Sequence, residues 1–412
     1  MYFIYNLFGK LVIILSPIIF FFRIISGKED LKRFKEKYCI YSFKNKKSYT
    51  VWLHATSVGE VMSIIPILKE LDNNNKIGQV LLTTSTTSSA NIFLKYKFKK
   101  TIHRYFPLDT NYFTKKFIKY WKPQIAIFVE SEIWPNMFKN LHSNKIPIIL
   151  LNARITKKSF KKWQIFSKFA KNVFSKIDLA MPQNSETQRY LKLLGATKIK
   201  IAGNLKYYGK KKVEKNSIVF KNKFRNHKIL CAASTHNNEE ALIGNLHKSL
   251  RKQKKNLLTI IIPRHIKRIK SIARELGKLG LKTTIHSSNN KISKSTDVYL
   301  VDSFGEASKF YQLSNITFMG GSIVQHGGQN PLEPARQKNY VLHGPNVHNF
   351  REVYDFLNKL NICSKAKSIK KLREKVLKNL DYKMPKRINN KIFLTGKKIL
   401  SKNLLLINKY IK

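Results

Sequence analysis

Two successive series of short apolar segments run through the chain, and each alternates with segments of helical periodicity. The first series covers residues 51–55, 80–84, 125–130, 146–151 and 179–182, and the second covers residues 229–233, 258–262, 298–301, 316–319 and 340–343. Between the segments of each series, apolar residues recur at the spacing of an amphipathic helix, as in residues 60–71. Short apolar runs that alternate with amphipathic helices predict βαβ units, and therefore parallel sheets.

The pattern restarts after residues 206–213, a stretch with lysine and glycine that is typical of a linker. We therefore predict two doubly wound, Rossmann-like α/β domains, over residues 28–208 and 209–412, with a basic helical tail ending the second. A chain of 412 residues with 43% hydrophobic content is large and apolar enough to form a hydrophobic core in each of two domains. Because ligands of such sheets bind beyond the carboxyl ends of the strands, we expect the active site in a cleft between facing domains.

Residues 1–27 differ from the rest of the chain. Residues 2–25 are apolar except for Lys10, Arg23 and a few small or polar side chains, so the segment approaches the roughly 20 residues of a spanning helix, although Pro17 would kink it. A cleaved signal peptide has a basic region before its apolar core. Here the basic residues follow the apolar segment instead, which disfavours a signal peptide. We predict a membrane anchor or an interfacial helix, with the following residues on the cytoplasmic side. A buried N-terminal helix is the alternative.

The charge balance narrows the class of partner. Seventy-nine lysines and arginines against 23 acidic residues give a net charge of +56, which predicts attraction to nucleic acid, an anionic membrane surface or a phosphorylated substrate. A general enrichment of the chain in lysine, asparagine and isoleucine accounts for part of this net charge. The charge is spread along the chain and no RNA-binding motif accompanies it, so nucleic acid is disfavoured. Three widely spaced cysteines indicate reduced thiols in a cytosolic protein.

Residues 318–350 contain the densest group of ligand-binding signals. An apolar run leads into Gly320, Gly321 and Ser322, and an Asn-Pro-Leu-Glu-Pro sequence then opens a predicted helix. Glycines let backbone N–H groups approach an anion, and a helix N-terminus adds partial positive charge. Glu333, one turn into that helix, is suited to a ribose diol. The segment predicts a nucleotide-sugar site, whereas a single glycine pair would only indicate a tight turn.

Two further strand ends of the second domain carry polar side chains. Ser234, Thr235 and His236 follow one strand, and Arg264 follows the next. Hydroxyl groups, backbone N–H groups and a guanidinium can converge on one phosphate or one sugar carboxylate. Together with residues 320–322 and Glu333 they predict an anionic nucleotide pocket.

In the first domain, Glu60 is the candidate general base. It follows a predicted strand at a helix start, where its ionised form is favoured and can accept a proton from an attacking hydroxyl. The spacing to Ser57 is equally that of a capping box, a structural role. His54, just before this turn, is expected to be structural.

Two carboxylates, Glu130 and Glu132, end another strand of the first domain. Buried carboxylates need partners, and Lys206 at the end of the domain could supply the counter-charge. Helix capping is the alternative role for Glu132. No cluster of histidine and aspartate has metal-ligand spacing, so no metal is predicted.

These motifs resemble those of the 3-deoxy-D-manno-octulosonic acid (Kdo) transferases of lipopolysaccharide synthesis, in the same order. The resemblance covers residues 51–350 and rests on the strings WLHATSVGE, ESEIWPN, LNARIT, GNLK, ASTHNNEE, IPRH, GGSIVQHGGQNPLEPA and HGPNVHNF. Asn238 stands where the family pattern usually has glycine, and residues 83–90 lack a family-like proline or arginine.

The resemblance implies a GT-B-type glycosyltransferase that needs neither metal nor cofactor. It implies transfer of Kdo, with inversion, from CMP-Kdo to the lipid A precursor at the cytoplasmic face of the inner membrane. Glu60 would be the general base and Glu130 and Lys206 essential groups. The implied donor contacts are Ser234, Thr235, Arg264, Gly320, Gly321, Ser322, Asn330 and Glu333. The rival reading is another GT-B nucleotide-sugar enzyme, a UDP-sugar transferase or an epimerase.

Overall fold

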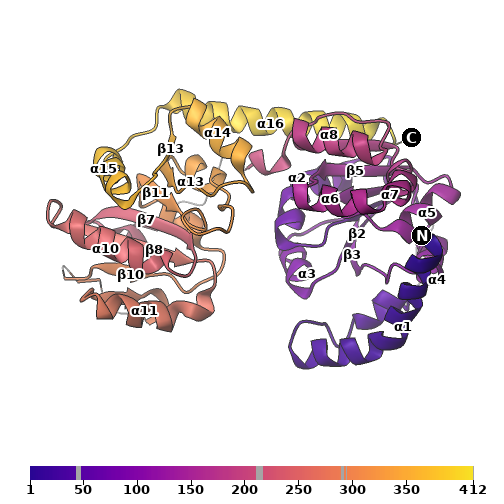
Figure 1. Ribbon diagram of the computed structural model, residues 1–412, viewed down its shortest axis with the longest axis horizontal. Helices are drawn as coiled ribbons and strands as arrows, with labels where there is room; N and C mark the ends of the chain where they lie inside the picture. The colour runs from indigo at the N-terminus through magenta and orange to yellow at the C-terminus, as the bar shows by residue number, and fades with distance from the viewer. Residues whose placement is uncertain (43–47, 210–216, 289–291, 294, 412) are drawn as a thin grey trace. The chain divides into compact units, whose positions relative to one another are not determined.

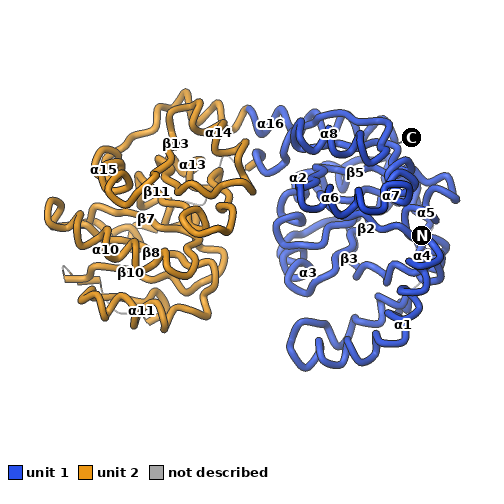
Figure 2. The backbone as a smooth tube through the Cα atoms, viewed as in Figure 1, with its two compact units in different colours: residues 1–208, 395–412 blue, residues 209–394 orange. Residues whose placement is uncertain are grey.

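The chain forms two compact units. The computed structural model describes residues 1–42, 48–209, 217–288, 292–293 and 295–411. The first unit contains Met1–Tyr208 and Thr395–Lys412, and the second contains Gly209–Leu394 (Figure 2). The division after Tyr208 coincides with the predicted one. Of the predicted linker, residues 210–213 lie outside the described part of the chain.

The first unit is built on a six-stranded parallel sheet with the order β3-β2-β1-β4-β5-β6 (Figure 1). Its strands are β1 (Thr50–His54), β2 (Gln79–Thr84), β3 (Thr101–Tyr105), β4 (Ile125–Val129), β5 (Ile148–Ala153) and β6 (Leu179–Pro182). Its helices include α2 (Val58–Asn73), α3 (Thr87–Leu94), α4 (Asn111–Trp121), α5 (Pro135–Ser143), α6 (Lys157–Ile165), α7 (Ser167–Phe174) and α8 (Ser185–Leu194). The five strands expected from sequence are confirmed. The edge strand β3 was not predicted.

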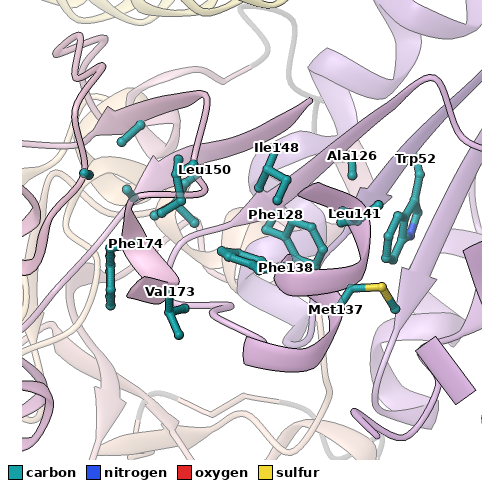
Figure 3. Packing of buried hydrophobic residues seen from close by; sticks show 14 of the residues in the cluster. Trp52, Ala126, Phe128, Met137, Phe138, Leu141, Ile148, Leu150, Val173 and Phe174 are labelled. Carbon is teal, nitrogen blue, oxygen red and sulfur yellow. The ribbon is translucent and has the colours of Figure 1, made fainter. Parts of the chain in front are cut away.

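Alternate residues of each central strand supply two separate cores. Trp52 and Phe128 belong to one cluster, together with Phe138 of α5 (Figure 3). Leu53 and Ile127, their neighbours in sequence, belong to the cluster on the opposite face of the sheet. Successive side chains of a strand point to opposite faces, so helices cover both sides and the strands are apolar throughout.

The second unit holds a seven-stranded parallel sheet with the order β13-β12-β11-β7-β8-β10-β9. Its strands are β7 (Lys228–Thr235), β8 (Leu257–Pro263), β9 (Thr283–Ile285), β10 (Val298–Leu300), β11 (Ile316–Met319), β12 (Tyr340–His343) and β13 (Cys363–Lys365). Its helices include α9 (Ile218–Asn222), α10 (Glu239–Arg251), α11 (Ile269–Lys278), α12 (Ala307–Tyr311), α13 (Leu332–Arg336), α14 (Arg351–Lys359) and α15 (Ile369–Asn379). The prediction of two doubly wound domains is confirmed.

The chain ends depart from a simple division in sequence. Helix α16 (Lys386–Asn408) begins in the second unit, but from Thr395 onward its residues belong to the first. Leu400, Ile407 and Ile411 pack into the same core cluster as Leu53. The prediction that residues 395–412 belong to the second domain is therefore wrong, because their apolar side chains complete a core of the first.

Helix α1 (Tyr2–Ile25) is continuous through Pro17. Among the described residues it is the one helix long and apolar enough to cross a membrane, judged by length and composition. Its N-terminal part lies beside α4 and α5 (Figure 1), where Tyr2 and Ile13 pack against the first core. The alternative prediction of a buried N-terminal helix is wrong, because most of the large apolar side chains of α1 are exposed.

Removing a buried side chain of α16 should unfold the first unit more easily. Ile407→Ala is expected to lower its free energy of unfolding by about 2–5 kcal/mol, because Ile407 is fully buried. Leu405→Ala, 63% exposed in the same helix, should change it by less than about 0.5 kcal/mol. All four tryptophans lie in the first unit, so their fluorescence in a urea titration reports that unit alone. Equal effects of the two variants would contradict the assignment of α16.

Candidate active site

Glu60 lies in the first turn of α2, directly after β1. Its carboxylate accepts the N–H of Thr56 at 2.7 Å and the hydroxyl of Ser57 at 2.9 Å, while Ser57 Oγ accepts the N–H of Glu60 at 3.2 Å. The capping box is therefore present. Burial and the charge of Glu132 raise the pKa of Glu60 to about 7, against the opposing hydrogen bond from Thr56. The cap holds in place a carboxylate whose pKa suits a base near neutral pH, so the two roles are compatible.

Glu130 directly follows β4 in a left-handed conformation, with φ of 57°, and the residue is buried. Lys206 Nζ lies 2.6 Å from Glu130 Oε1. The predicted counter-charge is thus confirmed. A buried carboxylate is stable in its ionised form only with such a partner.

Three side-chain amides fix the backbone that carries Lys206. The N–H of Lys206 donates to Asn204 Oδ1 at 2.9 Å, and Asn204 Nδ2 donates to Gln183 Oε1 at 3.0 Å. Asn152, at the end of β5, accepts the N–H of Leu205 through Oδ1 at 3.0 Å and receives Gln183 Nε2 at its carbonyl at 2.9 Å. Sequence reasoning did not select Asn152 or Gln183, although both fall at strand ends. Their bonds place Lys206 opposite Glu130.

Glu132 is held by aromatic side chains and does not cap a helix. Its Oε2 lies 3.2 Å from His54 Nε2 and accepts the indole N–H of Trp134 at 2.9 Å. Burial acts to raise the pKa of Glu132, but the hydrogen bond and charge of His54, together with hydrogen bonds from Thr56 and Trp134, make the net shift downward. His54 is fully buried, bonds Thr83 and stacks on Phe106, which agrees with a structural role. Glu132 therefore stays ionised near Glu60.

In the second unit, the glycine-rich loop after β11 surrounds a carboxylate of the protein itself. Glu239, fully buried at the start of α10, accepts the N–H groups of Gly321 at 2.7 Å, Ser322 at 3.1 Å and Ile323 at 3.0 Å. It also accepts the N–H of His236 at 3.0 Å. The loop amides of Gly321 and Ser322, expected to stabilise a phosphate, are thus occupied. Sequence reasoning missed Glu239, whose only signal was a pair of glutamates at a helix start.

Glycine is required in this loop for steric reasons. A Cβ at Gly320 would collide with the carbonyl of Ser234, and a Cβ at Gly344 would collide with that of Ser322. Gly321 has a φ of 64°, which side chains rarely adopt. The hydroxyl of Ser322 accepts the N–H of Gly344 at 2.8 Å, so this buried side chain serves the loop structure.

The other predicted donor residues of the β7 and β8 ends come together. Ser234 has a φ of 54° at a shift of register in β7, and the N–H of Arg264 donates to the carbonyl of Thr235 at 3.0 Å. Thr235 is buried, whereas Arg264 is exposed at the end of β8. Asn238, where the family pattern usually has glycine, has a φ of 72° and occupies the N-cap position of α10. Asparagine tolerates this left-handed conformation, so the departure is conservative.

A histidine group lies beside these residues. His236 stacks on His326 at 4.0 Å between ring centroids, and His265 lies edge-on at 6.0 Å. Burial, followed by the charges of His326 and His265, lowers the pKa of His236 to about 4. A nearby anionic ligand would favour the charged histidine, so the group is suited to an anion.

Asn330 and Glu333 frame the short helix α13. Asn330 Oδ1 accepts the N–H of Leu332 at 3.1 Å, and Glu333 lies in the first turn with its side chain exposed. Gln329 Nε2, one residue earlier, lies 3.3 Å from His236 Nε2 and links this turn to the β7 end. The structure therefore brings the predicted donor residues to one edge of the second sheet. Within the described ranges, no group of three or more histidine, cysteine or acidic side chains could hold a metal ion.

Comparison with known proteins decides the family. Residues 32–208 match the family model of 3-deoxy-D-manno-octulosonic-acid transferases. The 3-deoxy-D-manno-octulosonic acid transferase of Rickettsia bellii is 32% identical over 92% of this chain and 90% of the relative, and that of Haemophilus influenzae is 31% identical over 85% and 84%. The chain belongs to the Kdo transferase family. It is therefore a glycosyltransferase, and the resemblance of its motifs to that family is confirmed.

A solved structure shares the fold of both units. The UDP-GlcNAc 2-epimerase of Neisseria meningitidis covers 86% of this chain and 99% of its own, with a TM-score of 0.58 and 13% sequence identity. This likeness concerns the fold alone. It confirms the GT-B-type class, which transferases and epimerases share.

Glu239→Gln should loosen the glycine-rich loop. The amide offers one acceptor oxygen in place of two, so some of the four N–H groups lose their partner, at a cost of about 1–3 kcal/mol. Amide exchange of residues 318–325, followed by mass spectrometry, is expected to accelerate by roughly 5- to 150-fold. Glu374→Gln removes an exposed surface ion pair and should leave this exchange unchanged. Unchanged exchange in Glu239→Gln would show that the carboxylate does not order the loop.

Proposed function

We propose that this Kdo transferase moves Kdo from CMP-Kdo to the lipid A precursor, lipid IVA, with inversion and release of CMP. The observation that carries the proposal is the fixed carboxylate of Glu60, with its raised pKa, in a chain of this family. An inverting transfer needs one base beside the acceptor hydroxyl. Glu60 supplies it at the carboxyl edge of the first sheet.

In the proposed reaction, the acceptor hydroxyl attacks the anomeric carbon of Kdo from the face opposite the phosphate. The new bond joins the acceptor oxygen to the anomeric carbon, while the bond from that carbon to the phosphate oxygen breaks. The hydroxyl proton passes to the Glu60 carboxylate, and CMP leaves with the bonding electron pair. Because the phosphate is a good leaving group, the scheme assigns no step to a metal ion or cofactor.

Glu130 and Lys206 are proposed to serve the acceptor side. Their ion pair, held by Asn152, Gln183 and Asn204, places a cation and an anion at the same sheet edge as Glu60. Lys206 can interact with a phosphate or hydroxyl of the acceptor, and Glu130 keeps its ammonium in place. Neither group needs to exchange a proton for this role.

The second unit is proposed to bind CMP-Kdo. Arg264 offers positive charge to the phosphate and the Kdo carboxylate, and the imidazole of His236, Ser234, Thr235 and Asn330 offer polar groups. Glu333, in the first turn of α13, is proposed to accept hydrogen bonds from the ribose diol. Since Glu239 occupies the amides of Gly321 and Ser322, we assign stabilisation of the departing CMP to Arg264 and not to that loop.

The proposed location is the cytoplasmic face of the inner membrane. Helix α1 presents apolar side chains, and Lys28, Lys32 and Lys35 follow it. These lysines are suited to anionic headgroups on the cytoplasmic side. The acceptor is itself a phosphorylated lipid of that membrane, so the enzyme would meet its substrate there.

Incubation of the full-length enzyme with CMP-Kdo and lipid IVA tests the proposal. The mass of the lipid should increase by Kdo and CMP should appear in step, whereas a UDP-sugar epimerase or transferase would leave CMP-Kdo intact. Glu60→Ala should reduce kcat by about 100- to 10,000-fold, the range expected for a general base. An unchanged lipid mass with folded, membrane-reconstituted wild type would exclude the reaction. Full activity of Glu60→Ala would exclude the base.

The pH dependence of kcat/KM should report the ionisation of Glu60. The base must be deprotonated, so kcat/KM is expected to rise with pH through an apparent pKa of about 7. Glu132→Gln removes a neighbouring negative charge that raises the pKa of Glu60, and should move the rise to lower pH. Glu374→Gln, on the surface of the second unit, is the matched control. If Glu132→Gln does not shift the pH dependence of kcat/KM, the ionisation of Glu60 does not determine that dependence.

A further inference from the structure

Helix α1 is fixed to the first unit along one of its faces. The hydroxyl of Tyr5 donates to Asp109 Oδ2 at 2.7 Å, and that carboxylate also accepts the N–H groups of Asn136 and Met137 at the start of α5. Ser16 Oγ lies 2.6 Å from the hydroxyl of Tyr38. The contact of Tyr5 thus ties the helix, through Asp109, to the segment that follows Glu132, and the contact of Ser16 ties it to Tyr38.

The opposite face of α1 is apolar and exposed. Its stripe of large side chains recurs at helical spacing and is 50–79% exposed, comprising Phe3, Leu7, Leu11, Ile14, Ile18 and Phe22. Such a stripe on a helix docked along its other face is suited to lie in the boundary of a lipid bilayer. The bilayer would then border the side of the first unit on which α1 lies.

An apolar groove of about 410 Å³ runs between α1 and residues 106–110. Phe8, Val12 and Ile19 line it from the helix, and Phe106, Pro107 and Leu108 line it from the loop after β3. The helical lining extends from Tyr5 to Arg23, about 27 Å at 1.5 Å per residue. One bilayer leaflet is about 15 Å of hydrocarbon, so the groove is long enough for one acyl chain.

The polar parts of the groove match the two ends of a phosphorylated lipid sugar. Arg23 and Lys37 both pair with Glu29, at 2.9 Å and 2.7 Å, which leaves a net positive group on the lining. Elsewhere the lining includes Trp134, which bonds Glu132, and Ser85, whose Oγ lies 3.3 Å from Thr56 Oγ1. The N–H of Thr56 donates to Glu60. The groove thus extends to the immediate neighbours of the candidate base.

We propose that this groove binds one acyl chain of the lipid acceptor, drawn from the bilayer that contacts the exposed face of α1. The proposal rests on the proposed function and adds a second recognition element to it. With a chain in the groove, the phosphorylated sugar is held near Glu60, while the remaining chains stay in the membrane. The acyl chain then contributes to KM, and Glu60 contributes to kcat.

Substitutions on the two faces of α1 distinguish binding of an acyl chain in the groove from general contact of the helix with the membrane. Val12→Trp fills the groove and should raise the KM for lipid IVA by about tenfold, with kcat and the KM for CMP-Kdo unchanged. Ile14→Trp, at a position 71% exposed on the lipid-facing stripe, is the matched control and should leave all three constants unchanged. With the deacylated sugar phosphate as the acceptor, both variants should have the same kcat and KM as wild type. Leu108→Trp, on the opposite wall, repeats the test if Val12→Trp folds poorly.

A photocrosslinking measurement tests the groove without any turnover. Lipid IVA with a diazirine on one acyl chain, in vesicles with the full-length wild-type enzyme, should label the peptide containing Leu108, and Val12→Trp should abolish the labelling. If wild type transfers no Kdo but this labelling persists, the proposed function fails and the groove stands. Labelling confined to the Ile14 stripe, or equal rises in KM for Val12→Trp and Ile14→Trp, would overturn the groove.

Discussion

Each unit buries a carboxylate at the carboxyl edge of its sheet, and the donors that this carboxylate needs determine the surrounding loops. Glu130 is compensated by Lys206, whose backbone is fixed by Asn152, Gln183 and Asn204. Glu239 is compensated by four backbone N–H groups, three of them from the loop after β11. A buried charge without such partners would be very costly, so these contacts order the segments that carry the other polar groups.

The same edges concentrate unusual backbone conformations. Positive φ angles at non-glycine residues occur at Glu130, Asn152, Ser234 and Asn238. Glu130 follows β4, Asn152 and Ser234 are the penultimate residues of β5 and β7, and Asn238 lies between β7 and α10. Such conformations cost about 1–3 kcal/mol each and persist where surrounding bonds over-determine them. For Asn152 those bonds are visible, since both its side-chain oxygen and its carbonyl are hydrogen-bonded. The local strain therefore supports the placement of Lys206.

Strand pattern made the fold predictable, because central parallel strands are buried on both faces and appear as continuous apolar runs. The strands β3, β9 and β13 escaped detection because they are short or partly polar, as in the Thr-Ile-His-Arg-Tyr sequence of β3. The Glu130–Lys206 pair could be anticipated from the need for a counter-charge. The partner of the Gly321 amide could not, because local sequence shows that an N–H is available but does not show which distant acceptor occupies it. The same limit applies to residues 395–412, whose apolar periodicity is compatible with either core.

The suitability of Glu60 for the proposed role of general base depends on the charges of neighbouring carboxylates. Burial and the negative charges of Glu132 and Glu130 raise its pKa to about 7, far above that of a solvated carboxyl. His54 and Trp134 bond Glu132, whose pKa is lowered, and Lys206 pairs with Glu130. A carboxylate with an ordinary pKa would be ionised at neutral pH but would accept a proton weakly, whereas a more strongly raised pKa would leave it protonated. A pKa near 7 lies between these two limits. In the proposed mechanism, His54, Trp134 and Lys206 would therefore influence proton transfer through the carboxylates that they hold, without exchanging the proton themselves.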